Sequence, residues 1–285
     1  MNLKPTISII GTGALGSALL KFFRSSDYSI KSFWNSSEGS VFDKRKGEFV
    51  QSAGINSAVK EDFGKWIFVT TPDDVIPSIN ENLLTLSPNW SGFNCVHCSG
   101  GLTSSLLKPL QNAGANIASM HPIQTFGHGD DESRFKNIYI SIEGDKRITE
   151  QLLNIVEEMG AKSLIISADE KRKIHIAAVM VSNYIVSLLG ATESYLKDEG
   201  VEDGLEVLKP LISQTIKNVQ SKGVLSSLSG PIARGDEKTV KNHLSEINNE
   251  YIKNLYSLLG REAVRIAQRD NRIDKAKADQ LNKLL

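Results

Sequence analysis

The chain is poor in cysteine and carries no excess of charge of either sign. Its 285 residues include 2 cysteines, and 33 Lys and Arg side chains balance 33 Asp and Glu side chains. Without net charge there is no global field to attract nucleic acid or an anionic lipid surface. We therefore expect no nucleic-acid partner. The tight basic cluster from Lys171 to Lys173 is interpreted as a solvated helix face.

Long apolar runs are also missing. No stretch of about eighteen unbroken apolar residues occurs, which argues against a membrane-spanning helix and a membrane partner. The N-terminus lacks the charged segment and long apolar core of a secretory signal. Without low-complexity segments or internal repeats, neither a disordered tail nor a solenoid is expected. We expect a cytoplasmic protein whose length allows two domains.

The two cysteines stand at Cys95 and Cys98, at the end of an expected strand. Side chains three positions apart on a strand point to opposite faces, and no second pair is present to complete a zinc site. The pattern therefore predicts buried thiols in a reducing compartment and no metal site.

A glycine-rich turn near the N-terminus is the most informative motif. The apolar run at 6–10 leads directly into a Gly-x-Gly-x-x-Gly pattern and then into a helical pattern. Gly11 permits the tight turn, Gly13 lets a pyrophosphate approach the backbone, and Gly16 lets the helix pack closely on the strand. An ordinary strand-to-helix turn is the alternative. The predicted cofactor-binding residues of the turn are Gly11, Gly13, Ala14, Leu15 and Gly16.

The end of the second strand indicates which dinucleotide binds. The strand at 29–34 is followed by Asn35, Ser36 and Ser37, with no carboxylate at the position that binds the ribose of NAD. Short hydroxyl and amide side chains suit a ribose phosphate, and the neighbouring basic residues Lys44 and Arg45 could assist. These residues favour NADP, whereas Glu38 at the ribose would favour NAD.

Three further strands are expected to end in polar tips at the carboxyl edge of the sheet, where open α/β sheets bind ligands. The first tip carries Thr70, Thr71 and Pro72, which we assign to the cofactor. The other tips carry Ser99 at 98–101, and His121 and Gln124 at 121–126. A last strand pair at 138–142 and 163–166 flanks an amphipathic helix at 146–159. This alternation predicts an α/β, doubly wound Rossmann dinucleotide-binding domain at 1–166.

The pattern changes to helices alone after Ile166. Ser167 and Glu170 form a capping box that opens a long helix through about Leu196. Further helices are expected at about 206–220, 236–247, 250–259 and from 261 to the end. The sequence therefore predicts an all-helical domain at 167–285. The long helix that the capping box opens has an apolar surface wider than packing on one domain requires, which favours a homodimer.

Several motifs together resemble a known family. They are Gly11 to Gly16, Thr71 to Asp74, His97 to Gly100, His121 to Phe126, Ser182 to Tyr184 and Ser229 to Asp236. Over nearly its whole length the chain resembles the Rossmann-like NADP oxidoreductases whose helical C-terminal domain has no assigned function. That group is a branch of the 6-phosphogluconate dehydrogenase-like and pyrroline-5-carboxylate reductase-like superfamily. The resemblance implies a cofactor domain, a helical domain for substrate binding and dimerisation, and a site between them.

One departure from this superfamily concerns proton transfer. The related hydroxyacid dehydrogenases carry a catalytic lysine one turn before an asparagine on the first long helix of the second domain. If Asn183 matches that asparagine, Val179 occupies the lysine position. His175 shares the helix face of Asn183, and His121 lies at a strand tip. Since histidine exchanges protons near neutral pH without a large pKa shift, His121, His175 and Asn183 are the expected catalytic residues. Structural hydrogen bonding is the alternative for each.

Arg234 completes the predicted site. It follows a Gly-Pro turn and precedes Asp236, which caps the next helix. A guanidinium held on such a turn suits a carboxylate, although a salt bridge to Asp236 is an alternative. Arg234, Gln124 and Ser99 are therefore the expected substrate-binding residues.

These residues predict an NADP-dependent oxidoreductase. It would transfer a hydride between the nicotinamide and a carbonyl or imine of a small metabolite that bears a carboxylate. A catalytically silent NADP-binding sensor or scaffold is the alternative, because the lysine of the related dehydrogenases is missing at Val179.

The strand tip at Ser36 gives the first testable prediction. NADPH should bind more tightly than NADH, and Ser36→Asp should reverse the order because it places a negative charge against the ribose phosphate. Titration calorimetry with both nucleotides measures this. Equal or tighter NADH binding by the unaltered protein would show that Glu38 or another acid occupies the ribose position.

Overall fold

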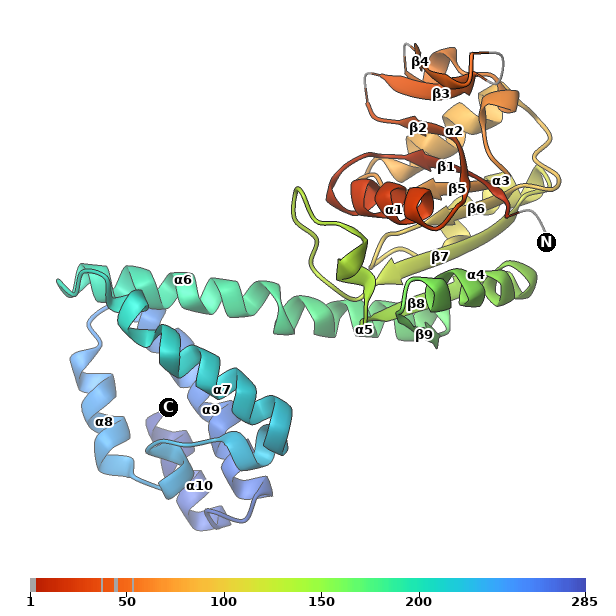
Figure 1. Ribbon diagram of the computed structural model, residues 1–285. Helices are drawn as coiled ribbons and strands as arrows, with labels where there is room; N and C mark the ends of the chain where they lie inside the picture. Colours follow the sequence, from red (N-terminus) through yellow and green to blue (C-terminus); the bar gives the residue numbers. More distant parts are fainter. Residues whose placement is uncertain (1–3, 37, 44–45, 53) are drawn as a thin grey trace. The chain divides into compact units, whose positions relative to one another are not determined.

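A computed structural model describes residues 4–36, 38–43, 46–52 and 54–285 (Figure 1). Its contacts divide the chain into two compact units, Met1–Val181 and Ser182–Leu285. The division predicted from the sequence at 166 follows the last strand, whereas the contact-based division follows the next helix, α5 (Ala168–Val181).

The described residues of the first unit build one mixed sheet. Its strand order is β4-β3-β2-β1-β5-β6-β7-β8-β9. Strands β2, β1, β5, β6 and β7 pair in parallel, β8 runs antiparallel to β7, and β9 pairs in parallel with β8. The bounds are β1 Thr6–Ile10, β2 Ser29–Trp34, β3 Gly39–Asp43, β4 Glu48–Ser52, β5 Trp66–Val69, β6 Asn94–His97, β7 Asn116–Pro122, β8 Tyr139–Gly144 and β9 Lys162–Ile165.

The predicted Rossmann-like architecture is confirmed, with one difference. In the described part of the chain, no helix lies between β2 and β3; instead the antiparallel hairpin of β3 and β4 extends the sheet. The ring of Phe49 on β4 lies 5.3 Å from that of Phe33 on β2 and 5.3 Å from that of Phe42 on β3. These aromatic contacts attach the hairpin to the sheet.

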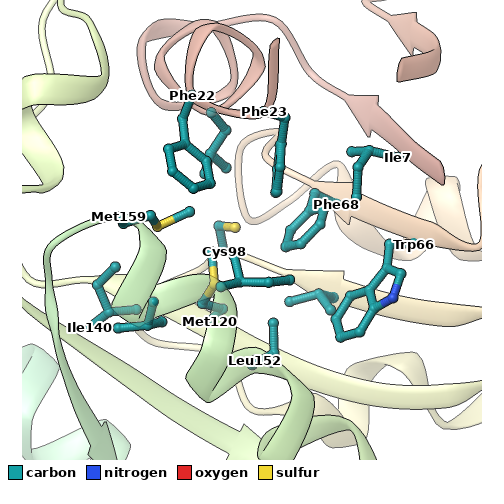
Figure 2. Close-up of a cluster of buried hydrophobic side chains, with 14 of the residues drawn as sticks. Ile7, Phe22, Phe23, Trp66, Phe68, Cys98, Met120, Ile140, Leu152 and Met159 are labelled. Atoms are coloured by element: carbon teal, nitrogen blue, oxygen red, sulfur yellow. The ribbon is translucent and has the colours of Figure 1, made fainter. Parts of the chain in front are cut away.

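Two apolar clusters fill the two faces of the sheet. The helices of this unit are α1 Ala14–Ser25, α2 Ile76–Leu86, α3 Lys108–Asn112, α4 Lys146–Glu158 and α5, with the short turn η3 at Ser104–Leu107. One cluster joins α1 and α4 to the sheet, and Figure 2 shows Phe22 and Phe23 of α1 in it. The other cluster joins α2 and α3. Cys98 belongs to the first cluster and Cys95 to the second, so both thiols are buried on opposite faces as predicted.

The second unit contains helices and no strand among its described residues. The helices are α6 Asn183–Asp198, α7 Gly204–Ser227, α8 Glu237–Glu246, α9 Glu250–Arg269 and α10 Lys275–Leu284, with the short turn η5 at Ile232–Arg234. Its core is formed by Val240, Val264, Ala267 and Leu281 with their neighbours. The prediction of an all-helical C-terminal part is confirmed.

Two predicted helix boundaries differ from the structure. The long helix expected from 169 to 196 is interrupted at Ser182, between α5 and α6. The interruption expected at Gly260 is absent, because this glycine serves packing instead. A Cβ at Gly260 would lie 2.7 Å from a methyl carbon of Leu285. The helix continues to Arg269, and Asn271 beyond it has a φ of 55°.

The helical segment Ala168–Asp198 leaves an apolar surface uncovered on the single chain. Ile176, Val181 and Val186 are 61%, 69% and 70% exposed. Within the described chain, this segment has the length and composition that would allow a helix to cross a membrane. The absence of a membrane partner therefore stays a prediction.

Candidate active site

The glycine turn adopts the geometry that the motif requires. Gly11 has a φ of +101° and donates its N–H to the carbonyl oxygen of Trp34 at 2.7 Å. A Cβ at Gly16 would lie 1.8 Å from the carbonyl oxygen of Gly11 and 2.5 Å from Thr70 Oγ1. Only glycine therefore allows α1 to approach β1 and the end of β5 this closely.

The N-terminus of α1 is open to a ligand. Gly13 is the N-cap residue. Among the described residues, no side chain caps the helix there, and nothing lies within 4 Å of a Cβ placed at Gly13. The helix begins at Ala14, and the partly buried Leu15 packs against the core. An uncapped helix N-terminus with free space around it suits the pyrophosphate of a dinucleotide.

The tip of β2 is only partly described. Ser37, Lys44 and Arg45, which the sequence assigned to the ribose phosphate, lie outside the described residues. Glu38 accepts hydrogen bonds on its two carboxylate oxygens, from Asn35 Nδ2 at 3.2 Å and from Gln51 Nε2 at 2.9 Å. Ser36 is exposed at this tip. Engagement of Glu38 by two amides agrees with the preference for NADP.

Thr70 and Thr71 follow β5 directly. Thr70 N donates to the carbonyl oxygen of Ile10, and Thr70 Oγ1 donates to that of Gly11. Thr71 Oγ1 is buried and has no hydrogen-bond partner among the described residues. Pro72 is exposed. These residues therefore lie beside the glycine turn, at the carboxyl edge of the parallel strands.

A row of paired residues, which includes the buried polar side chains of His97 and Ser119, crosses the neighbouring strands at the same edge. The register pairs Val69 with His97, His97 with Ser119, and Ser119 with Glu143. Directly paired residues point to the same face of a sheet. Ser119 Oγ and His97 Nε2 are buried without a hydrogen-bond partner among the described residues.

His121 and His175 meet over a glycine. Their rings lie 6.0 Å apart at an interplanar angle of 79°. A Cβ at Gly100 would lie 2.4 Å from His175 Nδ1 and 2.8 Å from His121 Nε2. His175 Nδ1 is also buried without a partner among the described residues. The structure therefore brings together two of the three predicted catalytic residues within the first unit.

The protonation of His121 differs from the expectation. Burial first, and then the charge of Lys171, lower the pKa of His121 to about 4. Burial likewise lowers the pKa of His97 to about 4. His121 is therefore neutral at pH 7 in the unliganded chain, and the prediction that it titrates near neutrality is wrong.

Lys171, which the sequence assigns to a solvated helix face, is buried beside the predicted site residue Ser99. It is 2% exposed, and its Nζ donates to the carbonyl oxygen of Ser99 at 2.7 Å. Its neighbour Lys173 does match the expectation, because its side chain is 73% exposed. Lys171 precedes His175 by one helical turn, and this spacing is the sequence signal that could have identified it.

Ser99 and Gln124, the predicted substrate-binding residues of this unit, make local contacts. Ser99 Oγ accepts the N–H of Leu102 at 3.0 Å and retains its own proton for donation. Gln124 is exposed, and its Oε1 accepts the N–H of Thr125 at 2.8 Å. Their role toward a substrate stays a prediction.

Asn183 and Arg234 belong to the second unit. Asn183 is exposed at the start of α6, where its Oδ1 accepts a hydrogen bond from Ser182 Oγ at 3.1 Å. Arg234 is exposed in η5, and no ion pair within 4.0 Å joins it to Asp236 in the described chain. Asp236 instead caps α8 by accepting the N–H of Thr239 at 3.0 Å, as predicted. The roles of Asn183 and Arg234 stay predictions.

Comparison with known proteins supports the architecture. A family model described as a domain of unknown function (DUF2520) matches residues 138–263. No curated protein matches the chain.

Solved structures share the fold over most of the chain. The putative NADP oxidoreductase BF3122 from Bacteroides fragilis is 19% identical, with a TM-score of 0.72 over 92% of this chain and 98% of that chain. Protein TM1727 from Thermotoga maritima is 24% identical, with a TM-score of 0.68 over 92% of this chain and 99% of that chain. The reductive aminase from Aspergillus terreus, in complex with NADPH and ethyl levulinate, is 15% identical, with a TM-score of 0.59 over 98% of this chain and 92% of that chain.

The chain has the fold of these proteins. At this level, the predicted resemblance to Rossmann-like NADP oxidoreductases with a helical C-terminal domain of unassigned function is confirmed.

The buried histidines predict a dependence of stability on pH. Because the pKa of His97 falls from 6.5 to about 4 on folding, the unfolded chain binds more protons between these values. The free energy of unfolding should therefore be highest above pH 6.5 and fall as the pH approaches 4, by on the order of 3 kcal/mol for this fully buried side chain.

Urea unfolding at pH 7 and pH 4.5 measures this difference. His97→Gln should lose less stability between the two pH values than the unaltered chain, whereas His128→Gln, at an exposed loop residue, should match the unaltered chain. Identical losses in all three proteins would contradict the burial of a neutral His97.

Proposed function

We propose that the chain is an NADP-dependent oxidoreductase. It transfers a hydride between the nicotinamide and a carbonyl or imine of a small metabolite that bears a carboxylate. The proposal rests on one observation: the glycine turn and the histidine pair lie at the same edge of the sheet. The open N-terminus of α1 follows β1. His121 lies near the end of β7, the third strand from β1 in the sheet, and meets His175 of α5 over Gly100, which follows β6.

The described residues fit a dinucleotide. The positive φ of Gly11, the free space at Gly13 and the close approach at Gly16 form a cradle that side chains would fill. Thr71 Oγ1 offers an unpaired buried hydroxyl beside the cradle. Bound NADP would supply or accept the hydride. The Aspergillus terreus reductive aminase, which shares the fold, was solved with NADPH and a keto ester.

The histidine pair would handle the proton that accompanies the hydride. In the reductive direction, a carbonyl oxygen or imine nitrogen gains a proton, and His121 on β7 or His175 on α5 would donate it. Negative charge that develops on the substrate raises the proton affinity of the neutral His121. Asn183 would hold the reacting group, and Arg234 would bind the carboxylate.

Turnover separates this proposal from a silent NADP-binding sensor. NADPH oxidation is followed by the absorbance of the reduced nicotinamide, with pooled keto acids and cyclic imines as candidate substrates. Gly13→Asp is the matched control, because a carboxylate at the N-terminus of α1 would repel the pyrophosphate, and the described residues leave the space around its Cβ open. Turnover that Gly13→Asp abolishes supports the proposal. NADPH binding with no turnover of any keto acid or imine favours the sensor.

Three substitutions distinguish the roles within the site. His121→Ala and Asn183→Ala should each lower the maximal rate by on the order of a hundredfold and leave NADPH affinity nearly unchanged. Arg234→Ala should instead raise the KM more than it lowers kcat, since a carboxylate anchor acts on ground state and transition state alike. Steady-state kinetics and NADPH titrations measure these effects. Full activity in all three variants at unaltered stability would show that the site lies elsewhere.

We also infer that the chain forms a homodimer through its uncovered apolar helices. Val181 ends α5, Val186 lies on α6, and both are largely exposed on the single chain. The second unit also contains an apolar groove of about 600 Å³, lined by Leu188, Tyr195 and Leu259 among others. A two-fold dimer is the commonest way to cover such surfaces.

Light scattering at micromolar concentration tests the dimer. The unaltered chain should have twice the monomer mass, and Val186→Asp should shift it toward the monomer because the interface would bury an unpaired charge. Val59→Asp, at another exposed apolar residue, should leave the mass unchanged. A monodisperse monomer of the unaltered chain would contradict the inference.

A further inference from the structure

Lys171 carries a buried charge that has no acidic partner in contact. It is 2% exposed, and its hydrogen bond goes to a neutral acceptor, the carbonyl oxygen of Ser99. No carboxylate oxygen of the described residues lies within 4.0 Å of its Nζ. A buried ammonium is costly unless it is compensated, so its position calls for a role beyond stability.

The hydrogen bond of Lys171 fixes the turn that follows β6. The N–H of Ser99 donates to His97 Nδ1 at 3.2 Å, and the carbonyl oxygen of Ser99 accepts from Lys171 Nζ at 2.7 Å. The side chain of Ser99 accepts the N–H of Leu102 at 3.0 Å. The backbone that enters Gly100 is therefore held from the sheet on one side and from α5 on the other.

That turn is the surface against which both imidazoles lie. Added atoms at Gly100 would clash with His175 Nδ1 at 2.4 Å and with His121 Nε2 at 2.8 Å. Lys171 and His175 are one turn apart on the same face of α5. The ammonium of Lys171 therefore links α5, which carries His175, to the turn against which His121 packs.

Several charged and titratable groups surround His121. Lys171 and His175 approach from α5, and His97 approaches from β6. Asp73, which follows β5, and Glu143 of β8 in turn interact with the charge of Lys171.

The carboxylate of Glu143 is held by the start of η3. It accepts from the N–H and the Oγ of Ser104, at 2.8 and 2.7 Å. Burial lowers the pKa of Lys171 to about 8, so the ammonium is still charged at pH 7. Its charge helps to keep His121 neutral.

We propose that Lys171 is a positioning residue of the histidine site, which fixes the Ser99–Gly100 turn against the two imidazoles and supplies a fixed positive charge beside His121. Its consequence for catalysis rests on the proposed function. Its effect on the protonation of His121 does not, because that effect requires only the folded chain.

The test follows the protonation of His121 by NMR in the folded chain without substrate. Lys171→Met removes both the donor and the charge, Lys171→Gln keeps a donor for the Ser99 carbonyl without the charge, and Lys171→Arg keeps the charge. The matched control is Lys173→Met, on the exposed side of the same helix.

Loss of the charge should raise the midpoint of the His121 titration by about half a pH unit or more in Lys171→Met and Lys171→Gln. Lys171→Arg and Lys173→Met should stay close to the unaltered chain. If Lys171 had only a structural role, the His121 midpoint would not differ between the neutral variants and the charged Lys171→Arg variant in this way. Folded Lys171→Met and Lys171→Gln proteins with an unaltered His121 titration would overturn the proposal.

If the neutral variants do not fold, the Nζ resonance of Lys171 in the unaltered chain tests the proposal instead. A buried ammonium bound to Ser99 should exchange its protons slowly and titrate well below Lys173, whereas a Lys171 signal that behaves like Lys173 would overturn the proposal. With a substrate from the screen, the pH profile of NADPH oxidation should move by the same amount as the NMR midpoint. A profile that stays in place while the NMR midpoint moves counts against the catalytic assignment of His121 and leaves the charge effect of Lys171 standing.

Discussion

The close approach of α1 to the sheet at Gly16 is the constraint on which the site depends. A Cβ there would lie 1.8 Å from the carbonyl oxygen of Gly11, so helix and strand can meet at this distance only through glycine. The approach brings the open helix N-terminus to the sheet edge where Thr70 follows β5, His97 ends β6 and His121 lies near the end of β7. A phosphate-binding turn and a proton-exchanging pair therefore share one edge because of backbone packing. No long-range charge is needed to explain it, since the chain has none in excess.

Polar groups in this region are buried where an apolar core would be more stable. Ser119, His97 and Lys171 are each at most 2% exposed, and unpaired buried polar atoms usually have an explanation in a ligand or a catalytic role. The described contacts hold Ser99 in the loop after β6 by three hydrogen bonds, yet leave Thr71 Oγ1, His97 Nε2 and His175 Nδ1 without partners. Hydrogen bonds therefore fix the turn at Ser99, whereas polar atoms around it lack hydrogen-bond partners, as expected for a preorganised binding site.

Features set by local sequence were predictable, and those set by tertiary contacts were not. The glycine turn, the capping box of Ser167 and Glu170, and the opposite faces of Cys95 and Cys98 depend on neighbours a few residues away. Gly260 looked like a helix end, but Leu285 packs against it from far along the chain. Lys171 looked solvated in a run of three basic residues, and only its tertiary contact with Ser99, in the turn after β6, shows that it is buried. The shifted pKa of His121 has the same origin, since burial causes it.

The central claim is that a dinucleotide binds at the glycine turn and reaches the histidine pair. A crystal structure of the chain with NADPH tests it most directly. The account predicts a pyrophosphate bound to the backbone N–H groups between Gly13 and Leu15, and a nicotinamide ring beside His121 at the end of β7. A nucleotide bound elsewhere, or a nicotinamide ring directed away from His121, would contradict it.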